Sequence, residues 1–182
     1  MLKHKIEKFE NKERLDELNP LGTLQDIGLT KESRVLDYGA GTGIFSIAAA
    51  NIAKTVFAYD INTEFLQHIK DKALSHGLTN VHTVEVGELS TIDQHSMDLI
   101  LLVTVFHEID DIDSLFEHLT TLLANNGTIV VIEFHKNKTP FGPSLAHRIS
   151  KQRVAEEFAK RNFHLLEDKD LGKNFYLVSF KL

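Results

Sequence analysis

The sequence has 182 residues, of which 42% are hydrophobic and 25% are charged, and these values are typical of one globular domain rather than of a disordered or membrane protein. Its 20 Lys and Arg residues against 26 Asp and Glu residues give a net charge of −6, which disfavours a nucleic-acid partner. The absence of cysteine excludes disulfides, thiolate-bound metals and a cysteine nucleophile, so any chemistry depends on oxygen, nitrogen or a cofactor.

The first 33 residues precede the predicted sheet. Residues 1–7 alternate charged and apolar side chains, which does not indicate a secretory signal, so a cytoplasmic protein is expected. Residues 3–29 have a helical pattern with one polar face, broken at Pro20 and Gly22. We expect residues 1–33 to form a helical cover or lid over a core of residues 34–182, within a single domain of residues 1–182.

In the core, short aliphatic runs alternate with longer helical patterns. The predicted strands are residues 34–38, 55–59, 81–86, 98–103, 128–134, 163–167 and 175–180, and the predicted helices are residues 43–53, 63–76, 112–124 and 150–161. Strands that alternate with helices indicate an α/β fold with a parallel sheet and helices on both faces. The last two strands are separated only by a short polar stretch with Gly172, so we expect them to form an antiparallel hairpin, with the last of the seven strands reversed.

A glycine-rich turn follows the first predicted strand and opens the next helix. Its notable residues are Asp37, Gly39, Ala40, Gly41 and Gly43. Glycines permit a tight turn and a close approach of the backbone to a ligand, so the turn predicts a nucleotide or cofactor site. The dinucleotide pattern G-x-G-x-x-G fits poorly, because its last glycine falls on Ile44 or Ser46. The pattern that fits is D-x-G-x-G-x-G.

This pattern resembles the first motif of the class I S-adenosylmethionine-dependent methyltransferases, which have a Rossmann-like, doubly wound seven-stranded sheet, mostly parallel with a reversed last strand. The resemblance implies that the glycine turn packs against the methionine portion of the cofactor and that Asp37 holds its amino group, directly or through water. It also implies that Asp60, at the end of the second strand, accepts the ribose hydroxyls and that Ile61 lies against adenine. Asp60 could instead cap the following helix, although Asn62 could do so too.

The third and fourth strands supply further candidates. In the family, an acid after the third strand often accepts the adenine amine, and Glu88 could take this role. Glu85 or a backbone carbonyl could serve equally, and Glu88 could simply be an exposed loop acid. Ligands bind at the carboxyl ends of parallel strands, so residues 103–108 should line the pocket, with Val103 beside the cofactor.

His107 and Glu108, at the end of this segment, are the catalytic candidates. If the methyl acceptor is a hydroxyl, His107 could act as its base, because imidazole titrates near neutral pH. It could instead pack at the strand end and bond a backbone carbonyl. Secondary candidates are Glu133, His135 and His147.

An acidic cluster after the fourth strand could suggest Mg²⁺. Its members are Glu108, Asp110, Asp111 and Asp113. An aspartate before residues 114–116 is also typical of a helix start, and the ten histidines contain no pair at metal-binding spacing. We expect no metal site.

The expected function is transfer of a methyl group from S-adenosylmethionine to a small molecule by in-line displacement. Residues 139–143 and 147–150 resemble the small-molecule branch of ubiquinone- and menaquinone-biosynthesis methyltransferases. One alternative is a module that binds S-adenosylmethionine or S-adenosylhomocysteine without catalysis, and another is a nucleotide-dependent oxidoreductase. Neither a nucleic-acid nor a membrane partner is expected, and the sequence does not indicate the oligomeric state.

Overall fold

The computed structural model describes residues 2–182. The helices are α1 (Leu2–Phe9), α2 (Lys12–Leu18), α3 (Pro20–Asp26), α4 (Ile44–Ala50), α5 (Thr63–Ser75), α6 (Ile112–Leu122) and α7 (Lys151–Ala159), with short 3-10 turns η1 (Leu89–Thr91), η2 (Phe106–Glu108) and η3 (Leu145–His147). The strands are β1 (Arg34–Tyr38), β2 (Thr55–Tyr59), β3 (Val81–Val84), β4 (Met97–Val103), β5 (Leu123–Phe134), β6 (His164–Leu171) and β7 (Phe175–Lys181). None of these helices has both the length and the apolar character that crossing a bilayer requires.

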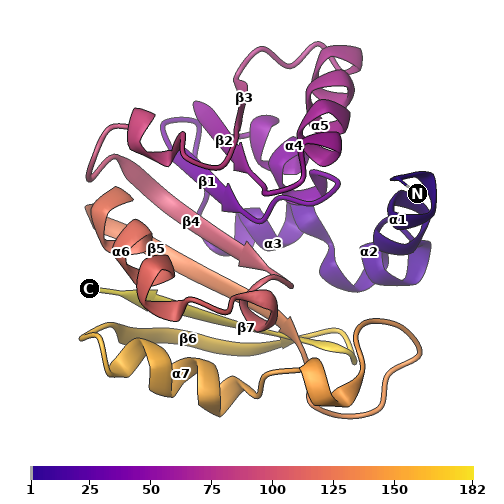
Figure 1. Cartoon of the computed structure of the whole chain (residues 1–182), viewed down its shortest axis with the longest axis vertical. Helices are drawn as coiled ribbons and strands as arrows, with labels where there is room; N and C mark the ends of the chain where they lie inside the picture. The colour runs from indigo at the N-terminus through magenta and orange to yellow at the C-terminus, as the bar shows by residue number, and fades with distance from the viewer. Residues whose placement is uncertain (1) are drawn as a thin grey trace.

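The seven strands form one sheet in the order β3-β2-β1-β4-β5-β7-β6, shown in Figure 1. Strands β1 to β5 are parallel, and β7 runs antiparallel to both of its neighbours, β5 and β6. The predicted fold and its reversed last strand are therefore confirmed. In this order β1 lies between β2 and β4, so the carboxyl ends of these three strands meet at one edge of the sheet.

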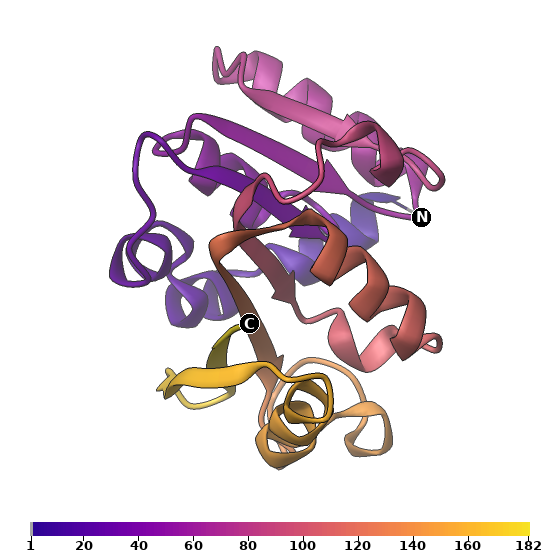
Figure 2. The ribbon, with the colours of Figure 1, turned by 90° about the vertical axis from the view of Figure 1, so that its left-hand side faces the viewer.

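Helices lie on both faces of the sheet, as Figure 2 shows from the side. Apolar side chains on the two faces of the sheet form two separate clusters. Leu36 of β1 belongs to the cluster that contains residues of α6 and α7, and Val35 belongs to the cluster that contains residues of α2, α3 and α4. In the first cluster the Phe158 and Phe180 rings stack with centroids 3.9 Å apart. Successive residues of a strand point to opposite faces, which is why one short apolar run serves both layers.

Polar side chains cap the starts of α5 and α6. The Asn62 side chain accepts a hydrogen bond from the Glu64 backbone N–H and so caps α5, a role that Asp60 could also have taken. The Asp111 side chain caps α6 by accepting from the Ser114 backbone N–H at 3.0 Å. The helix-start interpretation of the acidic cluster is thereby confirmed for Asp111.

The N-terminal helices break at other points than predicted. Pro20 begins α3 instead of breaking a helix, because proline has no N–H to lose at the first helical position. Gly22 lies inside α3. One break lies between Phe9 and Lys12, and the other falls at Asn19, whose φ of 37° ends α2 in the left-handed conformation.

Three strand boundaries differ from the prediction by more than one residue. Strand β3 ends at Val84 rather than at Val86, which is 64% exposed and gains no core contact by staying in the sheet. Strand β5 begins at Leu123, which pairs with Met97 of β4, so α6 ends two residues earlier than predicted. Strand β6 runs to Leu171, because pairing with β7 continues through its polar residues.

Candidate cofactor and active site

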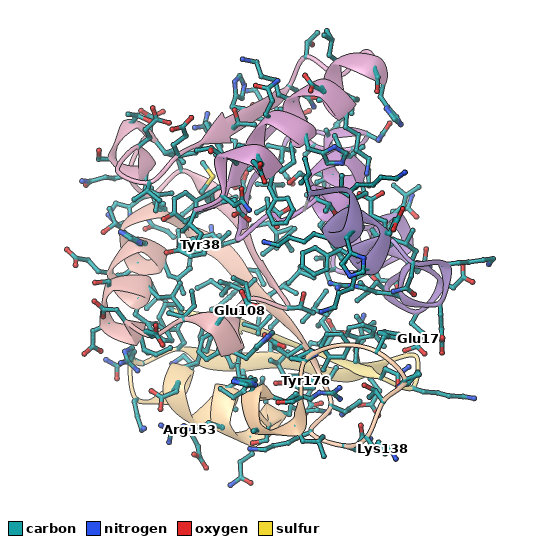
Figure 3. All side chains as sticks on the ribbon, turned by 45° about the vertical axis from the view of Figure 1, so that its right-hand side comes forward. Glu17, Tyr38, Glu108, Lys138, Arg153 and Tyr176 are labelled. Atoms are coloured by element: carbon teal, nitrogen blue, oxygen red, sulfur yellow. The ribbon has the colours of Figure 1, made fainter. Side chains whose placement is uncertain are left out.

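A cavity of about 470 Å³ lies at the carboxyl ends of β1, β2 and β4. This volume is within the roughly 300–1,000 Å³ of typical small-molecule sites. Its lining comes from the glycine turn, the ends of β2 and β4, the N-terminal helices and the loop after β5. Tyr38 and Glu108, two of the lining residues, are labelled in Figure 3. The predicted residues that line it are Asp37, Gly39, Ala40, Gly41, Asp60, Ile61, Val103, His107 and Glu108.

The glycine turn is held against the ends of β2 and β4. The Gly39 and Ala40 backbone N–H groups donate to the Tyr59 carbonyl at 2.8 and 2.9 Å. Gly39 has a φ of 77°, and a Cβ atom there would lie 2.4 Å from the Val105 side chain. Only glycine allows the segment after β4 to approach the turn so closely.

Gly43 has a packing role and is not among the residues that line the cavity. Its φ is 75°, and a Cβ atom there would lie 2.6 Å from Cγ1 of Ile69 on α5. The fourth position of the motif therefore sets how closely α4 and α5 pack.

Asp60 presents a rigid carboxylate to the cavity. Its Oδ2 accepts a hydrogen bond from the Gly41 N–H at 2.7 Å, and its Oδ1 accepts one from the Asn62 N–H at 2.8 Å. Each carboxylate oxygen can accept a further hydrogen bond, so the group can also receive two hydroxyls of a ligand. Ile61, whose side chain is largely exposed, lines the cavity beside it.

Asp37 is a buried carboxylate at the base of the cavity, only 1% exposed. Burial raises its pKa to about 6, nearby Asp60 adds to the rise, and a 2.5 Å hydrogen bond from the Ser46 hydroxyl opposes it. An ammonium group in the cavity would stabilise the ionised form.

Replacing Asp37 by asparagine is expected to stabilise the ligand-free protein at pH 7.5 while weakening ligand binding. The pKa of Asp37 in the folded protein lies above the ordinary value of an aspartate, so the free energy of unfolding falls as pH rises from about 4 through about 6. The full shift corresponds to at most about 3 kcal/mol. Urea unfolding of both proteins at pH 7.5 and pH 4 measures the effect, and a stability difference that is equal at the two pH values would contradict it.

Arg14, on α2, is a site residue that sequence reasoning missed. It is only 8% exposed and lines the cavity, and its Nη2 donates to the Thr104 hydroxyl at 2.8 Å. Thr104 has a φ of 52°, a strained conformation for a β-branched residue, directly after β4. Ninety positions separate the two residues, and no local pattern marks Arg14, so only the tertiary fold reveals the contact.

Arg14 stays positively charged in this apolar setting. Its guanidinium lies 5.5 Å from the Phe9 ring centroid and 5.9 Å from that of Phe134. Burial lowers its pKa to about 10, which the negative charge of Glu133 opposes. The cavity therefore contains a permanent cation.

The residues present fit S-adenosylmethionine. Two buried polar atoms, Arg14 Nε and Thr42 Oγ1, have no hydrogen-bond partner within residues 2–182, and both side chains line the cavity. The Arg14 cation and the Asp37 carboxylate suit the carboxylate and the ammonium group of an amino acid. Asp60 suits the hydroxyls of a ribose.

His107 is held by a buried carboxylate at the other side of the cavity. Its Nδ1 lies 2.7 Å from Oε1 of Glu133, which also accepts the His107 backbone N–H at 3.2 Å. The side chains are 5% and 1% exposed. The partner is thus a carboxylate, not the backbone carbonyl of the alternative interpretation.

This contact sets the protonation of the imidazole. A proton on Nδ1 is shared with Glu133, which leaves Nε2 free to accept another. Burial lowers the pKa of His107, but the hydrogen bond and negative charge of Glu133 outweigh it, so the pKa is raised. Nε2 lies 3.7 Å from Oε1 of Glu108, whose side chain is 71% exposed.

Four of the other sequence candidates lie away from the cavity lining. Glu88 is exposed, and its Oε2 accepts a hydrogen bond from the Glu85 backbone N–H at 2.9 Å, so its side chain bonds within its own loop. His135 pairs with Asp170 at 3.2 Å, and His147 bonds Ser144 at 2.8 Å. Across residues 2–182, no group of three or more His, Asp or Glu side chains is arranged to hold a metal ion.

A family model described as a methyltransferase domain matches residues 29–175. The ubiquinone biosynthesis O-methyltransferase of Cupriavidus pinatubonensis is 25% identical over 126 residues, which cover 68% of this chain and 51% of that protein. That of Paracidovorax citrulli is 27% identical over 131 residues, covering 70% of this chain and 55% of that protein. The chain thus spans about half the length of these curated relatives.

A solved structure supports the same fold. The crystal structure of a SAM-dependent methyltransferase from Aquifex aeolicus superposes with a TM-score of 0.89 at 22% identity, covering 97% of this chain and 96% of that chain. The likeness extends over the sheet and the N-terminal helices. With the family match over most of its length, the chain belongs to the methyltransferase domain family, and it shares the fold of this solved structure.

Proposed function

We propose that this protein transfers the methyl group of S-adenosylmethionine to a hydroxyl group of a small, largely apolar molecule. One observation carries the proposal: Asp60, with its rigid carboxylate, and His107, which the buried Glu133 holds, line the same cavity. The first group suits the cofactor, and the second suits removal of a proton from an acceptor. The names of the curated O-methyltransferase relatives agree with a hydroxyl acceptor.

The cofactor contacts in this proposal come from the glycine turn and its neighbours. Asp60 receives the ribose hydroxyls, Ile61 lies against adenine, and Asp37 and Arg14 hold the two charged ends of the methionine portion. Val103 lies beside them at the end of β4. When bound, the cofactor supplies a sulfonium methyl group that is already strongly electrophilic. The residues therefore need only to orient the acceptor and exclude water, and such positioning contributes roughly 7–11 kcal/mol to lowering the barrier.

The acceptor contacts come from apolar side chains around His107. Those that line the cavity there are Val105, Ile109, Phe134, Phe141 and Pro143. His107 Nε2 accepts the hydroxyl proton, and the buried Glu133 stabilises the imidazolium that forms. Glu108, 3.7 Å from Nε2, offers a second negative charge at the cavity mouth.

The proposal also covers the domain organisation, the partner and the cellular location of the protein. Residues 1–33 act as the cover of a single domain of residues 1–182, and Lys5, Lys8 and Phe9 of α1 line the cavity in support of this role. The net charge of −6 supports a small molecule over a nucleic acid as the partner. We place the protein in the cytoplasm, where cells make this cofactor.

Methyl transfer to small phenols tests the proposal. Incubation with S-adenosylmethionine labelled in its methyl group and a panel of simple phenols, catechols and aliphatic alcohols is expected to release S-adenosylhomocysteine and label a hydroxyl. Tight binding of S-adenosylhomocysteine without turnover of any acceptor would favour a binding module instead. Hydride transfer from a nicotinamide cofactor would favour the oxidoreductase.

A further inference from the structure

The segment between β5 and α7 forms one wall of the cavity although it contains little regular structure. Phe141, Gly142 and Pro143 of this segment line the cavity. A wall made of loop needs other contacts to keep it in place, because a strand ladder or a helix does not fix it.

Arg148, just before α7, supplies these contacts. It is only 6% exposed. Its Nε donates to the Pro143 carbonyl at 2.9 Å, its Nη1 to the His135 and Asn137 carbonyls at 3.0 and 2.7 Å, and its Nη2 to the Thr139 hydroxyl and the Phe141 carbonyl at 2.6 and 3.2 Å. A guanidinium has five N–H groups, so each of them has an acceptor within this one segment. Lysine, with three donors on one nitrogen, cannot reproduce this arrangement.

Aromatic packing fixes the same wall from the sheet side. The Arg148 guanidinium lies 5.0 Å from the Phe134 ring centroid, and the Phe134 and Phe141 ring centroids are 6.0 Å apart with their planes nearly perpendicular. Gly142 has a φ of 101°, and a Cβ atom there would lie 2.7 Å from the Phe134 ring. The backbone of the wall therefore rests directly on the end of β5.

The hydrogen bonds that hold the wall do not involve the groups that suit the cofactor. None of the five acceptors of Arg148 belongs to the glycine turn or to the segment around Asp60. The surface that the wall adds to the cavity is apolar and aromatic, beside His107. A flat apolar ring packs favourably against such a surface.

We infer that Arg148 is a positioning residue that holds Phe141 to Pro143 in place as the binding wall for a planar, apolar hydroxyl compound. The inference rests on the proposed function and deepens it by assigning the acceptor end of the cavity. Arg148 then governs the affinity for the acceptor and leaves the affinity for the cofactor unchanged.

The test measures the affinity of the S-adenosylhomocysteine-saturated protein for 4-nitrophenol, a planar phenol whose absorbance reports its binding. Arg148→Ala is expected to weaken 4-nitrophenol binding by about tenfold or more, because several charge-assisted hydrogen bonds are lost. Its affinity for S-adenosylhomocysteine should stay within about twofold of the original, since that end of the cavity keeps its contacts. Arg153→Ala is the matched control, because Arg153 lies on α7, forms ion pairs with Glu156 and Glu157, and is labelled in Figure 3. It should change neither affinity.

Chemical rescue separates positioning from general loss of stability. Ethylguanidinium added to Arg148→Ala should restore 4-nitrophenol binding, whereas ethylammonium should not. If Arg148→Ala does not fold, Phe141→Ala replaces it, with the same expected split between the two affinities.

Three outcomes overturn the inference. The original protein could bind S-adenosylhomocysteine but no 4-nitrophenol, the variant could keep full affinity for the phenol, or the variant could lose both affinities in parallel without rescue. Failure of the original protein to bind S-adenosylhomocysteine would instead overturn the proposed function itself, so the two failures are distinguishable.

Discussion

Replacing Asp60 by alanine is expected to weaken S-adenosylhomocysteine binding by about a hundredfold or more. The proposed contacts are two hydrogen bonds from ribose hydroxyls to a carboxylate, and bonds to charged groups contribute roughly 1.5–3 kcal/mol each. The change also removes the acceptors of the Gly41 and Asn62 N–H groups, so the glycine turn loses one of its hydrogen bonds to the end of β2. Calorimetric titration with S-adenosylhomocysteine measures the loss.

Glu88→Ala is the matched control for this experiment. Glu88 follows β3 just as Asp60 follows β2, but its side chain bonds the Glu85 N–H and does not line the cavity. Its removal should leave the affinity within about twofold of the original. An equal loss in both variants would contradict the assignment of Asp60 and would return Glu88 to the cofactor site.

Replacing His107 by glutamine is expected to slow methyl transfer by roughly 10²–10⁴-fold, the usual contribution of a general base. Glutamine keeps a polar group of similar reach but cannot take up a proton at neutral pH. The affinity for S-adenosylhomocysteine should change little, because His107 lies on the acceptor side. Initial rates of S-adenosylhomocysteine release with a phenolic acceptor measure the effect, and an unchanged rate would rule out His107 as the base.

The pH dependence of the rate gives an independent check through Glu133. A base works in its neutral form, so the rate should fall as pH drops through the raised pKa of His107. Glu133→Gln removes the negative charge that raises this pKa, so the acid limb of the profile should move to lower pH while the plateau rate falls. An acid limb that stays in place would show that another group limits the rate.

The seven strands and their succession along the chain could be predicted from the sequence because hydrophobic periodicity carries that information. The glycine turn and Asp60 could also be predicted from the sequence. A strand, a turn and the end of the next strand are local patterns, and the fold brings them together at one edge of the sheet. The ends of the strands were harder to predict. Leu123 joins β5 because of its pairing with Met97, and nothing in residues 112–124 marks that tertiary contact.

The contacts of Arg14, Glu133 and Arg148 could not be predicted for a related reason. The partners of Arg14 and Glu133 become near neighbours only when distant elements pack, as with Arg14 and Thr104. Arg148 instead bonds mainly backbone carbonyls of the segment before it, and no side-chain pattern in the sequence marks such acceptors. Glu133 appeared in the sequence only as a secondary candidate, because its pairing with His107 joins the ends of β4 and β5. The motif positions Gly43 and Glu88 show the opposite case, since the sequence pattern singles them out while the cavity lining does not include them.

Parallel calorimetric titrations with S-adenosylhomocysteine and with NAD test the central claim most directly. We predict saturable binding of one S-adenosylhomocysteine per chain, lost in Asp60→Ala, and no comparable binding of NAD. Tight binding of NAD with no response to S-adenosylhomocysteine would contradict the assignment of this cavity as a methyl-donor site.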